Sequence, residues 1–320
     1  MAFNVANPPH PLGLVIYGPT ASGKSALGLE LARRLDGEIV TVDSLQVYRG
    51  MDIGTAKPSG GERAEVTHHL IDIADPHADE PFTVENWLKA AEGASGAIRA
   101  RGKRPIFVGG TSLYVQSLMY GLFEGPAANE EIRRELDELS DEALAEMLRR
   151  TDPKAAMRIH PSDRRRSIRA IEVFRLTGTT ISELQTQWSG RPARDDVKLV
   201  VLMRETDELN RRINARVKGM MSEGLLEEVR GLVEKGPLNR QAREGLGYKQ
   251  LLAHLENPKR VPLNDAVEKI KIETRRFAKN QRTWMKRMAG LGADHAKVVD
   301  ATGKEPGALL KATLAALGES

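Results

Sequence analysis

The chain has 320 residues, of which 40% are hydrophobic and 29% are charged, with a formal net charge of +4. It contains no cysteine, which excludes disulfide bonds and thiolate metal sites. No apolar run approaches the roughly 20 residues of a membrane-spanning helix, and the N-terminal residues lack the regions of a secretory signal. We therefore expect a soluble, cytoplasmic protein without a membrane partner.

The charge is distributed unevenly along the chain. Residues 158–169 carry a local charge of +4 and residues 269–287 one of +7, which leaves −7 for the remainder. Two concentrated basic segments in a mildly acidic protein favour a polyanionic partner such as nucleic acid. Charged runs are also common on solvated faces, so that alternative stays open for each segment.

The first part of the chain alternates between strand and helix patterns. Apolar runs predict strands at 12–18, 38–43 and 104–110, and amphipathic patterns predict helices at 24–35 and 81–102. Such alternation is typical of a parallel sheet with helices on both faces. The ligands of such sheets lie beyond the C-terminal ends of the strands.

Helical periodicity dominates the rest of the chain. It is the only pattern from about residue 123 to 192, where it covers 129–150, 162–178 and 181–188. One more strand is expected at 196–203, and further helices follow at 206–236, 248–289 and 301–318.

The turn between the first strand and the first helix matches the phosphate-binding pattern G-x-x-x-x-G-K-[ST] in full. It consists of Gly18, Pro19, Thr20, Ala21, Ser22, Gly23, Lys24 and Ser25. Its backbone N–H groups and the helix N-terminus can surround a phosphate. Lys24 would contact the terminal phosphate oxygens, and Ser25 would bind Mg²⁺. The pattern predicts a phosphorylated ligand but leaves the reaction open.

These patterns together define the expected fold. We predict the α/β class, with a P-loop parallel-sheet core and an inserted all-helical domain. The core would comprise residues 1–122 and 193–320, and the insertion residues 123–192.

Asp43 ends the second predicted strand, next to the phosphate loop. A carboxylate in this place can be a metal ligand, a general base or a solvated cap, and the residues alone leave all three open. Ser44 and Gln46 are suited to the edge of an adenine, although ordinary turn solvation would also explain them. The third strand ends in Gly109, Gly110 and Thr111, where a generic NTPase would have an aspartate, and the protein-kinase motifs are absent.

The second basic segment is expected to form a two-sided helix. Ile270, Phe277, Trp284 and Met288 fall within about 40° of one another on a helical projection and would form its buried stripe. The basic residues lie on the other side, where they could follow a nucleic-acid backbone or simply be solvated.

Two arginines of an earlier helix, Arg212 and Arg216, are four residues apart and would lie on one face. Their planar donor groups could bind a diphosphate, and pairing with Asp207 or Glu208 is the alternative.

Several of these motifs together resemble the tRNA isopentenyltransferase family, also called tRNA dimethylallyltransferases. The resemblance extends from about residue 14 to residue 288, and the zinc finger of eukaryotic members is absent, as in the compact bacterial form. The motifs that carry it are GPTASGKS, DSLQVYRGMDIGTAKP, HHLIDIADP, FVGGTSLYVQ, RIHPSDRRRSIRAIEVF, REGLGYKQ and TRRFAKNQRTW.

This resemblance implies a reaction and its catalytic residues. A dimethylallyl group would pass from dimethylallyl diphosphate to N6 of the adenosine at position 37, just 3′ of the anticodon of tRNA, with release of diphosphate. Asp43 would be the general base and Thr111 would lie near the reacting base. Lys24 and Ser25 would hold the diphosphate with Mg²⁺ as cofactor, and Arg216, with Arg212, would contact the leaving group.

The same resemblance implies which residues contact the anticodon stem-loop. They are Asp43, Ser44, Leu45, Gln46, Thr111, Asn129, Arg164, Arg165, Arg166, Ser167, Arg243, Gly247, Tyr248, Lys279, Asn280, Gln281, Arg282, Trp284 and Lys286. We expect a monomer with no obligate protein partner. Two alternatives are a small-molecule P-loop kinase and an isopentenyltransferase that acts on free AMP or ADP. A third, a non-catalytic RNA-binding module, would leave the phosphate loop without a use.

Overall fold

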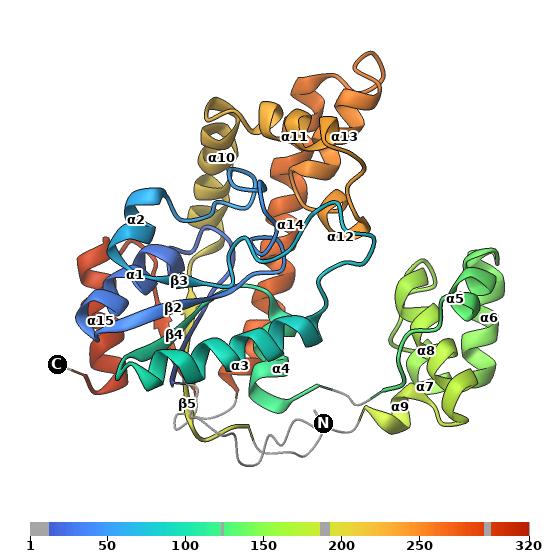
Figure 1. Ribbon diagram of the computed structural model, residues 1–320, viewed down its shortest axis with the longest axis horizontal. Coiled ribbons are helices and arrows are strands. Elements are labelled where there is room, and N and C mark those ends of the chain that lie inside the picture. The colour runs from blue at the N-terminus through green and yellow to red at the C-terminus, as the bar shows by residue number, and fades with distance from the viewer. Residues whose placement is uncertain (1–12, 123–124, 186–192, 291–295, 320) are drawn as a thin grey trace. The chain divides into compact units, whose positions relative to one another are not determined.

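The computed structural model describes residues 13–122, 125–185, 193–290 and 296–319 (Figure 1). The chain divides into two compact units. The described residues up to Met119 and from Ala193 onward form the larger unit, and those between Tyr120 and Pro192 belong to the smaller one. The larger unit contains both strands and helices, and the described part of the smaller unit is helical.

The larger unit is built on a six-stranded parallel sheet. Its spatial order is β3-β2-β4-β1-β5-β6. The strands are β1 (Gly13–Tyr17), β2 (Gly37–Val42), β3 (His68–His69), β4 (Arg104–Gly109), β5 (Val197–Met203) and β6 (Ala296–Asp300).

The central strand β1 joins the two sequence segments of the larger unit. Leu14 of β1 is in register with Ile106 of β4 on one side and with Lys198 of β5 on the other. The chain thus leaves the sheet after β4 and returns at β5, with the helical unit between them in sequence. This arrangement confirms the predicted α/β class with a helical insertion.

Four of the strands were expected from the sequence, and two were not. β1, β2, β4 and β5 begin and end within one residue of their predicted bounds. β3 and β6 lie at the two edges of the sheet, and they are only two and five residues long. Such short edge strands carry too few residues to produce a clear alternation of apolar and polar side chains.

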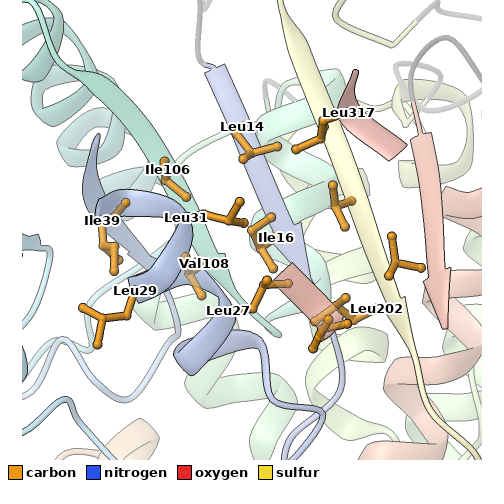
Figure 2. Packing of buried hydrophobic residues seen from close by; sticks show 14 of the residues in the cluster. Leu14, Ile16, Leu27, Leu29, Leu31, Ile39, Ile106, Val108, Leu202 and Leu317 are labelled. Carbon is orange, nitrogen blue, oxygen red and sulfur yellow. The ribbon is translucent and has the colours of Figure 1, made fainter. Parts of the chain in front are cut away.

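One face of the sheet is covered by α1 (Lys24–Arg34) and α15 (Pro306–Leu317) (Figure 2). Leu14 and Ile16 point to this face because alternate residues of a strand project to the same side. They pack in one cluster with Leu27 of α1 and Leu309 of α15. The buried leucines of α1 therefore fix the helix that begins at the phosphate loop.

On the opposite face, α3 (Val84–Ala100) packs on β2 and β4, and α4 (Ser112–Tyr120) follows β4 in the chain. Trp87 is fully buried, donates a 3.0 Å hydrogen bond to the Thr41 carbonyl and stacks on Tyr114 at a ring distance of 4.6 Å. A buried indole with a satisfied N–H provides a large contact area at little polar cost. It anchors the strand that ends at Asp43.

The remaining helices of the larger unit follow β2 and β5. They are α2 (Gly60–Glu65), α10 (Thr206–Ser222), α11 (Leu225–Glu234), α12 (Arg240–Arg243), α13 (Tyr248–Glu256) and α14 (Leu263–Ala289). The patterns expected as single helices at 206–236 and 248–289 are each divided in two. The divisions fall at Gly224 and between Asn257 and Pro262, where left-handed or extended backbone ends helical hydrogen bonding.

The smaller unit is a cluster of short helices. Leu136, Leu144, Ile168 and Ile171 belong to its apolar core. The predicted helix at 129–150 is divided, because Ser140 caps a new helix by accepting a hydrogen bond from the Ala143 N–H. The helices are α5 (Glu130–Asp137), α6 (Asp141–Thr151), α7 (Pro153–Ala156), α8 (Arg164–Thr177) and α9 (Ile181–Leu184). Across both units, none of the helices in the described ranges combines the length and the apolar character needed to cross a membrane.

Candidate active site

The predicted phosphate loop connects β1 to α1 at the C-terminal edge of the sheet. The Gly18 N–H donates to the Gly109 carbonyl at 3.3 Å, which ties the start of the loop to the end of β4. Gly23 directly precedes α1 with a φ of 97°, a left-handed conformation that other residues rarely adopt. The loop borders a cavity of about 340 Å³, which is lined by Ala21, Gly23, Lys24, Ser25, Ala26, Arg212, Ala215 and Arg216.

Lys24 is the cation at the centre of this loop. Its ammonium donates to the Pro19 carbonyl at 3.3 Å. Burial and, to a lesser extent, the neighbouring Arg216 lower the pKa of Lys24 to about 8, although the charge of Asp43 opposes both effects. Backbone hydrogen bonds join the end of β2, just before Asp43, to the end of β4, from Gly110 N–H to the Val42 carbonyl at 3.2 Å. Since the loop is tied to the end of β4 as well, Asp43 and the phosphate loop lie at the same edge of the sheet.

Three arginines contact three consecutive residues of the loop. Arg216 donates to the Thr20 hydroxyl at 3.4 Å, and Arg212 donates to the Ala21 carbonyl at 2.8 Å. Arg204, at the end of β5, donates to the Ser22 carbonyl at 3.2 Å. The loop is thus held by three arginines, of which Arg212 and Arg216 also line the cavity.

An ion pair of Arg212 or Arg216 with Glu208 was the alternative to diphosphate binding, but Glu208 pairs with another arginine. Glu208 forms its ion pair with Arg204, which is almost fully buried, and not with Arg212 or Arg216. Burial lowers the pKa of Arg216, and the charge of Asp43 raises it. The sequence analysis missed Arg204, because it lies between β5 and α10, where helical spacing does not apply.

Asp43 lies at the start of a tight turn beyond β2. Its Oδ1 accepts hydrogen bonds from the Leu45 and Gln46 N–H groups at 2.8 and 3.3 Å. Thr111 Oγ1 accepts a 3.2 Å hydrogen bond from the Ser44 N–H and so joins the ends of β2 and β4. Within the described residues, the hydrogen bonds of Asp43 use Oδ1, and Oδ2 remains suited to accept a proton.

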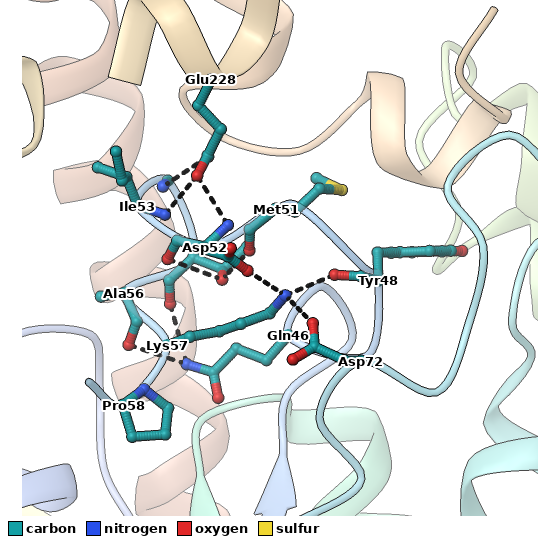
Figure 3. A network of polar contacts seen from close by, with 12 residues as sticks. Gln46, Tyr48, Met51, Asp52, Ile53, Ala56, Lys57, Pro58, Asp72 and Glu228 are labelled. Atoms are coloured by element: carbon teal, nitrogen blue, oxygen red, sulfur yellow. Dashed lines mark hydrogen bonds and ion pairs between the residues drawn. The ribbon is translucent and has the colours of Figure 1, made fainter. Parts of the chain in front are cut away.

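Gln46 is held by the loop that follows it (Figure 3). Its amide nitrogen donates to the carbonyls of Thr55 and Ala56 at 2.9 and 3.2 Å. The bidentate contact with adenine considered above would require both ends of this amide. In the observed arrangement only its oxygen is available to an incoming amine.

The same loop is tied to α11 by Glu228 (Figure 3). The Glu228 carboxylate accepts hydrogen bonds from three consecutive backbone N–H groups, those of Asp52, Ile53 and Gly54, at 2.6 to 3.1 Å. It also accepts a 2.6 Å hydrogen bond from the Tyr248 hydroxyl. The sequence analysis missed Glu228, because its three backbone partners lie more than 170 residues away in the chain.

Helix α14 has a buried side and a basic side, as expected, but its buried stripe differs. Ile270 and Met288 are buried, whereas Phe277 is 42% exposed and its assignment to that stripe was wrong. Trp284 is partly exposed and has the Arg287 guanidinium 5.3 Å from its ring centroid. The buried positions of α14 instead include smaller or polar residues, such as Ala278 and Gln281.

The expected tRNA contacts differ in their accessibility. Four of them are buried, namely Ser167, Gly247, Tyr248 and Gln281, so these residues do not lie on the surface in this structure. Those that are exposed are Arg165, Arg166, Arg243, Lys279, Asn280 and Lys286. The others are partly exposed, namely Asp43, Ser44, Leu45, Gln46, Thr111, Asn129, Arg164, Arg282 and Trp284.

Several of these side chains also have partners within the protein. Asn129 caps α5, Arg164 pairs with Asp141 at 2.7 Å, and Arg243 pairs with Glu256 at 2.5 Å. Exposed ion pairs of this kind are weak and can be exchanged for a phosphate contact.

The loop, its arginines and the neighbouring carboxylate define a P-loop protein with a candidate phosphate site close to a potential base. The family model described as IPP transferase matches residues 46–288, and the model described as isopentenyl transferase matches residues 13–72. The chain belongs to the IPP transferase family, which confirms the resemblance found in the sequence.

The similarity to known proteins extends over most of the chain. The tRNA dimethylallyltransferase of Geobacter metallireducens is 48% identical over 281 residues, which cover 86% of this chain and 89% of that protein. The tRNA dimethylallyltransferase of Thermosipho africanus is 45% identical over 276 residues, which cover 85% of this chain and 89% of that protein.

Solved structures of tRNA-modifying transferases also match most of this chain. The full-length tRNA isopentenylpyrophosphate transferase of Bacillus halodurans matches with a TM-score of 0.67 and 36% identity, over 95% of this chain and 96% of that one. A eukaryotic dimethylallyltransferase acting on tRNA matches with a TM-score of 0.76 and 29% identity, over 91% of this chain and 74% of that one.

Proposed function

We propose that this protein transfers a dimethylallyl group from dimethylallyl diphosphate to N6 of the adenosine at position 37 of tRNA. The observation that carries the proposal is the position of Asp43. The Val42 carbonyl directly before it accepts hydrogen bonds from the Gly110 and Thr111 N–H groups at 3.2 and 3.3 Å, and the Gly18 N–H of the phosphate loop donates to the Gly109 carbonyl at 3.3 Å. A potential base and the phosphate loop therefore lie at the same edge of the sheet. The names of the relatives favour this reaction over phosphate transfer to a metabolite and over prenylation of free AMP or ADP.

The leaving group would be bound by the loop and its cations. The α1 N-terminus, Lys24 and Arg216 would face the diphosphate, with Arg212 at the cavity wall. As the allylic C–O bond breaks, negative charge develops on the diphosphate oxygen. Fixed cations around the cavity stabilise that charge without having to reorganise.

Asp43 would activate the acceptor amine. The N6 lone pair of adenine is delocalised into the ring, so the amine reacts well only if a base takes its proton as the new N–C bond forms. Asp43 Oδ2 would receive that proton, since Oδ1 already accepts from the Leu45 and Gln46 N–H groups. Such base catalysis is typically worth about 10²–10⁴ in rate. Thr111 holds the Ser44 N–H and so fixes the turn in which the carboxylate lies.

Mg²⁺ fits this site only as a partner of the substrate. No cluster of three or more acidic or histidine side chains suited to a metal occurs among the described residues, and Ser25 offers one hydroxyl at the cavity. Mg²⁺ commonly binds through few protein ligands, with water and substrate phosphates completing its shell. When bound, it would neutralise charge on the diphosphate, and Ser25 would hold it there.

Exposed Arg and Lys side chains of both units would bind the phosphates of the tRNA. Arg165 and Arg166 begin α8 in the smaller unit, and Lys279 and Lys286 project from α14 in the larger one. Reaching a base stacked in the anticodon loop requires its extrusion, at a cost of a few kcal/mol. Phosphate contacts on the surrounding nucleotides offset that cost.

Replacement of Asp43 tests the proposed base. With labelled dimethylallyl diphosphate and bulk tRNA, Asp43→Ala should lose at least about 100-fold in transfer rate, because the amine keeps its proton. Filter retention of tRNA should change little. Asp79→Ala, which removes an exposed carboxylate from the same unit, should leave both measurements unchanged. Transfer by Asp43→Ala near the wild-type rate would remove the base assignment.

A further inference from the structure

Gln281 connects three elements that are distant in sequence. It lies on α14, and only 4% of its surface is exposed. Its amide oxygen accepts a 2.9 Å hydrogen bond from the Thr20 N–H in the phosphate loop. Its amide nitrogen donates a 2.7 Å hydrogen bond to the Gly110 carbonyl, directly after β4. One side chain therefore bridges the loop and the strand end that carries Thr111.

The surroundings of Gly110 show how tightly this bridge is packed. A Cβ atom at position 110 would lie 2.5 Å from the Gln281 amide nitrogen, 2.9 Å from the Gly18 carbonyl oxygen and 3.6 Å from Lys24 Cε. Only glycine leaves room for the amide, the start of the loop and the lysine stem at one point. The Gln281 amide thus lies next to the cation that would meet the diphosphate.

The hydrogen bond from the Thr20 N–H to Gln281 removes one backbone donor from the phosphate loop. This N–H is occupied by Gln281, so in this structure it is not one of the N–H groups available to a phosphate. The hydroxyl of the same residue accepts a hydrogen bond from Arg216 of α10. Thr20 is therefore held from α14 and from α10 at once, and both contacts set the shape of the loop.

We propose that Gln281 is a positioning residue, which sets the phosphate loop against Gly110 and Thr111 and does not contact tRNA itself. This assignment rests on the proposed function and replaces the tRNA contact expected from the sequence. Helix α14 then has two separate tasks. Its exposed Lys279 and Lys286 face a polyanion, and its buried amide aligns the donor site with the strand end beside the acceptor base.

Two variants separate the two hydrogen bonds. Gln281→Met keeps the length of the side chain and loses both bonds. Gln281→Glu can still accept from the Thr20 N–H, but it places a second acceptor against the Gly110 carbonyl and a negative charge near the diphosphate. The matched control is Thr283→Ala, which removes an exposed hydroxyl from the same helix.

The test compares donor and tRNA parameters in the full-length protein. Both Gln281 variants should weaken the binding of inorganic pyrophosphate with Mg²⁺, measured by calorimetry, and raise the donor KM by about tenfold or more. The glutamate variant should be affected more strongly because of its charge. The tRNA Kd without donor should stay within about twofold of wild type, and Thr283→Ala should change none of these values.

Two results would overturn the assignment. In one, pyrophosphate affinity and donor KM are unchanged in both variants. In the other, the tRNA Kd rises while the donor parameters stay constant, which would make Gln281 a tRNA ligand. Gly110→Ala provides a second route, because it crowds the same amide without changing α14, and it should reproduce the donor-specific loss. If the wild-type protein binds pyrophosphate but modifies no tRNA, the proposed function fails while the pyrophosphate arm still decides the role of Gln281.

Discussion

The cations Lys24 and Arg216 at the phosphate loop are not fully compensated by acidic side chains of the protein, which favours the binding of an anionic ligand. Arg204 is neutralised by Glu208 and fixes the Ser22 carbonyl, so its part is structural. Lys24 and Arg216 have lowered pKa values because burial disfavours their charges, and Asp43 compensates this only in part. A diphosphate would supply the missing negative charge. Its binding therefore stabilises the cationic forms of both side chains.

The lowered pKa of Lys24 predicts how donor binding depends on pH. Without ligand, Lys24 has a pKa of about 8, so it is mostly charged at pH 7 and mostly neutral at pH 9. A diphosphate prefers the charged form, and its Kd should therefore rise as the pH increases through 8, approaching about tenfold per pH unit. Calorimetry with inorganic pyrophosphate and Mg²⁺ between pH 7 and 9.5 measures this directly.

Lys24→Arg is the control for that profile. An arginine stays charged throughout this range, so the variant should lose the dependence on pH even if its affinity at pH 7 is lower. A flat profile in the wild-type protein would show that Lys24 does not govern the binding of the diphosphate.

At the scale of elements, α14 shows what periodicity can and cannot predict. Its two-sided character was correctly expected, because eight basic residues in 269–287 avoid one side of the helix. The buried stripe was misplaced at Phe277, which is exposed, and at Gln281, which is buried. A polar residue is buried here because the Thr20 N–H and the Gly110 carbonyl satisfy it. Those partners lie in other parts of the chain, so no local pattern reveals them.

The exposed side of α14 should contribute to the salt dependence of tRNA binding. Replacing Lys279 and Lys286 together with alanine removes two phosphate partners and should reduce the slope of log Kd against log salt by up to about two. The matched control replaces Lys89 of α3 and Lys311 of α15, which are also exposed. Filter binding from 50 to 300 mM salt measures both slopes. Equal salt slopes for the two double variants would show that this side of α14 is a solvated surface that does not contact tRNA phosphates.

For the whole molecule, the sequence predicted the order of the main strands and helices along the chain, but not the contacts between residues far apart in sequence. The phosphate loop, the four inner strands and the helical segment between β4 and β5 all follow from local patterns. The contacts that shape the site join residues far apart in the chain. Gln281 is 261 positions from Thr20, and Glu228 is 176 positions from Asp52. Such pairings depend on the folded topology, to which a single sequence gives no direct access.

The central claim is that the loop, Asp43 and the exposed cations act together on tRNA and not on a smaller acceptor. The most direct measurement incubates the protein with labelled dimethylallyl diphosphate and equal adenosine concentrations in tRNA, AMP or ADP, followed by digestion and separation of nucleosides. We predict label on N6 of a single adenosine next to the anticodon of tRNA, with transfer to AMP and ADP lower by at least about 100-fold, because free nucleotides lack the phosphate contacts. Equal labelling of AMP and tRNA, or label on another tRNA position, would contradict the account.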